Sequence, residues 1–320
     1  MKRTLLAINL AFAVTLSSAL GAWQPADAKE QGMQASSTAD RQAFDSPEAA
    51  AAALADAVRS GEPGRMLAVV GPKSRSWLVT SDAAADRAEG QNFLAAYDRK
   101  HGIRTKSEGQ ALLVVGDDDW EFPAPIVRVG SKWVFDSDAG REEILNRRVG
   151  RNELDTIQTL LAMVDAQREF AASDADGNGL RDYALRFAST PGKTDGLYWE
   201  TADGAPPSPM GPLAAKAVRE GYGSGVKAGK VQPYHGYLFR ILTAQGPHAD
   251  GGAFDYMVNG RLFGGFAIEA YPAAYGITGV KTFLVNHEGV VYEKDLGAST
   301  VALAEKIRRF DPGPGWSRIP

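Results

Sequence analysis

The chain has 320 residues, a net charge of −4 and no cysteine, and 44% of its residues are hydrophobic and 23% charged. These proportions are typical of folded soluble domains. The lack of cysteine excludes disulfides, cysteine-ligated zinc and a lipid-attachment cysteine. A mildly acidic chain without basic clusters also argues against nucleic acid as a partner.

The N-terminus has the layout of a cleaved secretory signal. Lys2 and Arg3 precede an uncharged apolar stretch at residues 5–20, and the small-residue pattern Ala-Asp-Ala follows at residues 26–28. The stretch is short for a membrane span, which takes about 20 residues; a retained N-terminal anchor is the alternative. We expect residues 1–28 to be removed, leaving a periplasmic or secreted protein with no transmembrane segment.

Residues 29–42 are polar and predict a flexible leader, and residues 43–138 predict an α+β domain. Ser46, with Pro47 in the first turn, is a helix start. The pattern predicts helices over 47–58, 64–70 and 91–100, then strands over 111–115, 126–129 and 132–135. Helices followed by an antiparallel meander resemble the cone of nuclear-transport-factor-2-like (NTF2-like) domains.

Residues 139–172 predict a long helix, or two helices joined near Gly150. Its apolar residues fall three and four apart, so they should form a stripe that packs on another element. The stripe consists of Leu154, Ile157, Leu161 and Val164, and the arginines expected to face water are Arg147, Arg148 and Arg151. We expect residues 139–316 to form a second domain from this helix and an antiparallel sheet.

A candidate calcium loop directly follows the long helix. Oxygen-bearing residues occupy loop positions one, three, five and nine, with glycine at six, and the position-seven carbonyl can add another oxygen. The predicted ligands are Asp174, Asp176, Asn178, Leu180 and Asp182. The spacing is similar to EF-hand-like and dockerin-like loops, but position twelve is Leu185 instead of glutamate. The alternative is a polar turn whose aspartates cap the neighbouring elements.

The second half predicts a short helix over 213–220 and then strand-like runs, again an α+β pattern. The runs are 234–244, 254–258, 265–271, 282–286 and 290–294. A histidine with a carboxylate partner can act as general acid or base. The candidates for such a role are His235, Asp255 and His287, with Arg240, Arg261 and Glu288 as further candidates.

Several short motifs resemble an exported bacterial family catalogued as a domain of unknown function, DUF2950. They are Tyr183-Ala184-x-Arg186-Phe187, residues 195–199 (Asp-Gly-Leu-Tyr-Trp), Gly236-Tyr237-x-Phe239-Arg240 and residues 279–292. The likeness covers about residues 43–316. The second half also resembles the globular head of type IV pilins and pseudopilins, in which a helix packs on an antiparallel sheet. Unlike a pilin helix, the helix here is amphipathic and follows another domain.

Two classes of function remain open. The first is a non-catalytic binding or assembly module of the cell envelope, whose partner is another envelope protein or a small ligand and whose acidic loop binds calcium. The second is a periplasmic hydrolase or lyase in which folding brings His235, Asp255 and His287 together. No nucleophile motif occurs, since Gly223-Ser224-Gly225 lacks the glycine spacing of a nucleophile elbow. The non-catalytic class is therefore favoured.

Overall fold

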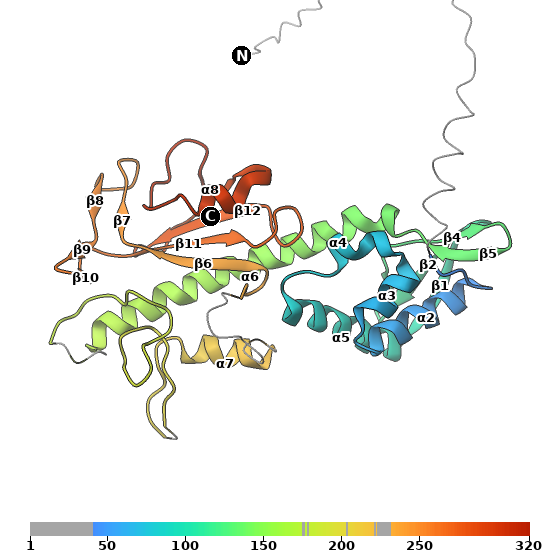
Figure 1. Cartoon of the computed structure of the whole chain (residues 1–320), viewed down its shortest axis with the longest axis horizontal. Helices are drawn as coiled ribbons and strands as arrows, with labels where there is room; N and C mark the ends of the chain where they lie inside the picture. Colours follow the sequence, from blue (N-terminus) through green and yellow to red (C-terminus); the bar gives the residue numbers. More distant parts are fainter. Residues whose placement is uncertain (1–40, 175–176, 178, 203, 221, 223–231) are drawn as a thin grey trace, which may run out of the picture. The chain divides into compact units, whose positions relative to one another are not determined.

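The structure, a computed structural model, describes residues 41–174, 177, 179–202, 204–220, 222 and 232–320. The predicted signal and almost all of the predicted leader lie outside this range. Helices and antiparallel sheets combine in the described part, which confirms the α+β class (Figure 1). In the described residues no helix is both long enough and apolar enough to cross a membrane.

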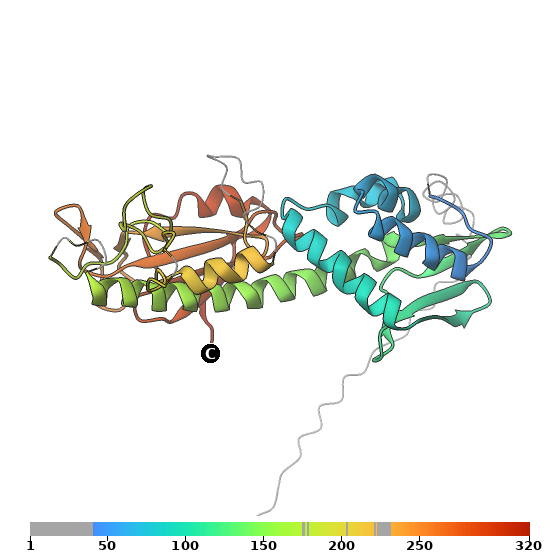
Figure 2. The ribbon, with the colours of Figure 1, turned by 90° about the horizontal axis from the view of Figure 1, so that it is seen from below.

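The first half packs helices on a five-stranded antiparallel sheet in which β1, β2, β4 and β5 are neighbours in that order and β3 pairs with β2. The helical elements are α2 (Pro47–Arg59), α3 (Pro63–Val70), the 3-10 turn η1 (Pro72–Ser74), α4 (Arg75–Leu78) and α5 (Ala83–Arg99). The strands are β1 (His101–Ser107), β2 (Gln110–Val115), β3 (Trp120–Glu121), β4 (Ile126–Val129) and β5 (Lys132–Phe135). Both α2 and α5 contact this sheet (Figure 2) and share one hydrophobic cluster with it.

The helix starts follow from side-chain caps. The Ser46 hydroxyl accepts a hydrogen bond from the Ala49 amide at 3.2 Å, as its position before a proline predicts. Helix α5 begins eight residues earlier than predicted, because Asp82 caps it by accepting from the Ala85 amide at 3.0 Å. Strand β1 was not predicted, since most of its side chains are exposed and polar.

Helix α6 (Ser137–Ser173) is a single helix of 37 residues that continues through Gly150. A glycine inside a helix costs about 1 kcal/mol relative to alanine. Tertiary contacts on either side of Gly150 offset that cost. The Arg148 guanidinium donates to the Trp77 carbonyl at 2.6 Å, and the Asn152 amide donates to the Thr278 carbonyl at 2.8 Å.

The predicted apolar stripe of α6 is correct for Ile157 and Val164, which pack in the core, and wrong for Leu154 and Leu161. Leu154 and Leu161 are 64% and 40% exposed, whereas Leu160 is fully buried and Val164 nearly so. The buried face also carries polar residues, among them Thr156, Thr159 and Gln167. Arg148, expected to face water, is 5% exposed and pairs with Glu89 at 3.1 Å.

The second half places α6 on one face of a five-stranded antiparallel sheet and α8 on the other (Figure 1). The order in this sheet is β14 (Ser317–Arg318), β13 (Val291–Asp295), β12 (Lys281–Asn286), β11 (Ala267–Pro272) and β6 (Tyr237–Leu242). Short pairs join β7 (Ala244–Gln245) to β8 (Phe254–Asp255) and β9 (Met257–Val258) to β10 (Arg261–Leu262). The remaining helical elements are α7 (Gly211–Arg219), the 3-10 turn η2 (Gly297–Ser299) and α8 (Thr300–Ala304).

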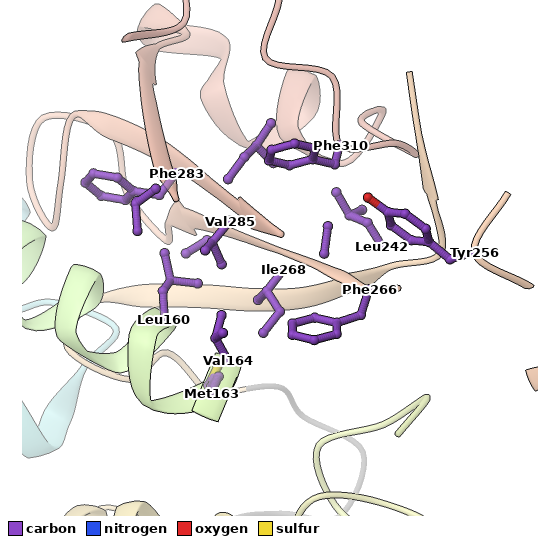
Figure 3. Packing of buried hydrophobic residues seen from close by; sticks show 14 of the residues in the cluster. Leu160, Met163, Val164, Leu242, Tyr256, Phe266, Ile268, Phe283, Val285 and Phe310 are labelled. Carbon is purple, nitrogen blue, oxygen red and sulfur yellow. The ribbon is translucent and has the colours of Figure 1, made fainter. Parts of the chain in front are cut away.

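The core of the second half lies between α6 and the sheet. Leu160, Met163 and Val164 point from α6 toward the strands that carry Ile268 and Val285 (Figure 3). This cluster is distinct from the one in the first half. The division into domains at 43–138 and 139–316 stays a prediction.

Candidate functional site

His235 lies in a strained turn directly before β6. Its φ is +49°, a left-handed conformation that residues with a side chain seldom adopt. The imidazole, with 14% of its side chain exposed, lies between two carboxylates. The Nδ1 atom is 3.6 Å from Asp155 Oδ2 on α6, and Nε2 is 3.4 Å from Glu220 Oε2 at the end of α7.

Two tyrosines complete the surroundings of this ring. Tyr234 packs against His235 with ring centroids 4.1 Å apart, and its hydroxyl donates to Glu220 Oε2 at 3.0 Å. The Tyr222 hydroxyl accepts from the His235 backbone amide at 3.1 Å. Burial, together with the neighbouring carboxylates, raises the pKa of both phenols, so both stay protonated and act as donors.

Asp82 connects this cluster to the first half of the chain. Its side chain is buried, and Oδ2 accepts hydrogen bonds from the Tyr222 hydroxyl at 2.9 Å and the Gly236 amide at 2.7 Å. Gly236 has a φ of +74°, and a Cβ there would meet Asn152 and Thr278 at 2.8 Å. We call Asp82, Asp155, Glu220, Tyr222, Tyr234 and His235 the junction cluster. It holds carboxylates, phenols and one imidazole that can carry a proton.

Folding does not bring His235 and His287 together, as the alternative hydrolase or lyase hypothesis requires. His235 precedes the end of the sheet at which Tyr237 pairs with Pro272, whereas His287 follows Asn286, which pairs with Ala267 at the other end. Five residue steps along a strand separate these ends by about 17 Å. Antiparallel register therefore keeps the two histidines apart.

Asp255 and His287 both have local structural contacts. Asp255 is exposed and its Oδ1 accepts from the Met257 amide at 2.8 Å. The His287 ring lies edge-on to Tyr256 with centroids 5.9 Å apart, and its amide donates to the Phe266 carbonyl at 3.1 Å. The His287 contacts fix the turn between β12 and β13, and the Asp255 bond lies between β8 and β9.

The remaining arginine candidates form ion pairs within the fold. Arg240 pairs with the buried Glu269 across β6 and β11, and it also donates to the Ala304 and Ile307 carbonyls at 2.7 Å. Burial raises the pKa of Glu269 to about 7, although Arg240 opposes that shift. Arg261 pairs with Asp182 at 3.2 Å.

The acidic loop is described only in part, since Asp176 and Asn178 lie outside the described residues. Asp174 ends α6 in the left-handed conformation, and its Oδ2 accepts from the Gly179 amide at 3.0 Å. Asp182 is 7% exposed and Leu180 is 42% exposed. Within the described ranges no group of three or more His, Asp or Glu residues has metal-binding geometry.

Sequence patterns did not identify Asp155, Glu220 and Tyr222, which contact His235, or Asp82, which is linked to it through Tyr222 and Gly236. One of them carried a readable signal, because Ser81-Asp82 before a run of alanines is a helix N-cap pattern. The other three are brought to His235 from distant positions by the path of the chain, which local spacing does not predict.

Comparison with known proteins finds one family. Residues 41–319 match the model of the family described as "Protein of unknown function (DUF2950)". No curated protein and no solved structure matches the chain.

Proposed function

The chain belongs to the family described as "Protein of unknown function (DUF2950)", and we propose that it is an exported, non-catalytic binding or assembly module of the cell envelope. Its partner would be another envelope protein or a small ligand. The predicted signal at residues 1–28 supports export to the periplasm or beyond. The spacing of the acidic loop supports calcium as a stabilising ion.

One observation carries the non-catalytic proposal: the acid–base candidates are dispersed. A general acid or base must lie within hydrogen-bond reach of the reacting group, and a pair must share one cleft. Register places His235 and His287 at opposite ends of one sheet. His248 bonds to Asp311 at 3.1 Å, and His101 stacks on Tyr97 with centroids 3.9 Å apart.

We also propose that the first half is an NTF2-like cone and the second half a pilin-like head that has become a soluble module. The supporting features are the helices on a meandering sheet in residues 44–135, and α6 against a sheet with a final hairpin in residues 281–295. A solved relative with the same strand order would test this assignment.

Turnover measurements on matched variants test the non-catalytic proposal. The full chain, His235→Gln and His287→Gln are compared on a panel of ester, phosphate, peptide and glycoside substrates, with melting temperature measured in parallel. We expect no turnover above the level of heat-denatured protein in any of the three. Turnover that is lost in one variant at an unchanged melting temperature would overturn the proposal.

The junction cluster favours a second candidate, a hydrolase or lyase that uses His235 alone of the three predicted residues. An imidazole flanked by the carboxylates of Asp155 and Glu220 is suited to proton transfer. In this case Asp155→Asn and Glu220→Gln should each reduce turnover, whereas His287→Gln should leave it unchanged. Unchanged melting temperatures in the two junction variants would separate this candidate from structural damage at the junction.

A further inference from the structure

A hollow of about 290 Å³ lies on the sheet face that carries α8. Six residues line it: Leu284, Ile307, Arg308, Arg309, Asp311 and Trp316. Leu284 comes from β12, and the others come from the segment that follows α8. The hollow is far from the junction cluster in sequence and uses none of its residues.

The floor of the hollow is apolar. Leu284 is buried in the core, and Ile307 and Trp316 pack against the same core cluster. At about 30 Å³ for each water-sized group, the volume accommodates roughly ten non-hydrogen atoms. The floor therefore fits a small apolar body, such as a short alkyl chain or one aromatic ring.

The rim of the hollow carries an excess of positive charge. Arg308 and Arg309 contribute two positive charges and Asp311 one negative charge, which leaves +1. The Asp311 carboxylate accepts from the His248 backbone amide at 2.8 Å, so part of its hydrogen-bonding capacity is used within the fold. Arg309 is exposed and forms no ion pair with any described residue.

We propose that this hollow binds a small carboxylic acid as its monoanion, with an apolar body of about ten non-hydrogen atoms or fewer. The apolar body would contact Leu284, Ile307 and Trp316. The carboxylate would accept hydrogen bonds from Arg309, because the planar guanidinium matches the two oxygens of a carboxylate. Arg308 would add its positive charge, since its Nη1 atom already donates to the Glu305 and Ile307 carbonyls. The net charge of the rim complements a single negative charge. This inference rests on the proposed binding role and names its ligand class.

Calorimetric titration of the full chain with octanoate tests the inference, with octan-1-ol and octylamine as probes of the same apolar body without the negative charge. We expect octanoate to bind and both other probes to bind at least about tenfold more weakly, since charged hydrogen bonds are lost. Arg309→Gln should weaken octanoate binding by about tenfold. Lys306→Gln, which removes an exposed cation outside the lining, should leave it unchanged.

Three results would overturn the inference. They are the absence of octanoate binding up to roughly 10 mM, equal affinity for the three probes, and equal affinity in the Arg309→Gln and Lys306→Gln variants. None of these results bears on turnover. A failed titration therefore rejects carboxylic acids as the ligand class. The non-catalytic proposal is tested separately, by the turnover of the histidine variants.

Discussion

Asp82 and Gly236 lie 154 residues apart in the chain, and a hydrogen bond of 2.7 Å joins the Asp82 carboxylate to the Gly236 amide. The same carboxylate caps α5 and accepts from the Tyr222 hydroxyl. One side chain therefore accepts hydrogen bonds from an amide at the start of α5 in the first half and from the Gly236 amide before β6 in the second. Because this carboxylate is buried, its removal should destabilise both the start of α5 and the turn before β6.

We expect Asp82→Ala to lower the free energy of unfolding by about 2–4 kcal/mol, because it removes a cap and leaves the Gly236 amide without this acceptor. Ser46→Ala is the matched control, since Ser46 caps α2 at an exposed position. That variant should cost about 1 kcal/mol. Urea denaturation measures both. Equal losses would show that the bonds to Gly236 and Tyr222 contribute nothing to stability.

Adjacent leucines of α6 give a direct test of its packing. Leu160→Ala should destabilise the protein by about 2–5 kcal/mol, because it opens a cavity in the core. Leu161→Ala, at a side chain that is 40% exposed, should change stability by less than about 0.5 kcal/mol. Thermal and urea unfolding distinguish the two variants. A larger loss for Leu161 than for Leu160 would contradict the observed phase of the helix.

The buried Glu269 should make stability depend on pH. Its pKa is raised to about 7 in the folded protein, against about 4.3 for an unperturbed glutamate. The folded state therefore holds a proton that the unfolded state has lost, and this contribution to stability is full below about pH 4 and lost as pH rises through about 7.

Comparison with Glu269→Gln isolates that contribution, because glutamine does not titrate. The melting temperature of the wild type should decline between about pH 4.5 and 7.5, and the variant should lack this decline. Melting curves at intervals across this range measure the difference. Parallel curves for the two proteins would show that Glu269 does not titrate there.

Calcium should stabilise the acidic loop. Asp174, Asp176 and Asp182 place three negative charges in one short segment, and a bound cation would offset their repulsion. An ion that binds only the folded state adds about 1.4 kcal/mol at tenfold excess over its Kd. Millimolar calcium should raise the melting temperature by a few degrees, and magnesium by less.

Two variants make the calcium test specific. Asp176→Ala should abolish the shift, whereas Asp165→Ala, at an exposed acidic residue of α6, should preserve it. A chelator provides the baseline. If calcium leaves the melting temperature of the wild type unchanged, the segment is a polar turn.

The intact mass of the recovered protein tests whether the predicted signal is cleaved. If residues 1–28 are a cleaved signal, intact protein recovered from the periplasm should have the mass of a chain that starts near Lys29. A membrane-bound product that retains Met1 would support the anchored alternative.

Local patterns predicted the helices and strands whose signals are contained in a few residues. The strands β4 and β5 and the start of α2 are confirmed, because a tight pair of strands and a cap at Ser46 depend only on neighbouring residues. The buried face of α6 was predicted only in part, because polar residues such as Gln167 lie on it beside the apolar ones. Gln167 donates to the Ala184 carbonyl and accepts from its amide, both at 2.8 Å. Hydrophobicity alone does not identify such a face.

The candidate site was predictable only in part. His235 was singled out because histidine is suited to proton transfer. Its partners Asp155 and Glu220 lie 80 and 15 residues away in sequence, and the position of His287 depends on strand register. These contacts and this register depend on the tertiary fold, and no short sequence pattern predicts them.

The continuity of α6 has a consequence for the order in which the chain folds. The hydrophobic cluster of the first half is complete once residues up to Phe135 are available, so it is able to fold early. The apolar face around Leu160 is covered only when β11 and β12 are present, more than a hundred residues later. Until then that apolar face is exposed to solvent and prone to aggregation. If the chain is exported, a chaperone would have to protect this face before and after the chain crosses the membrane.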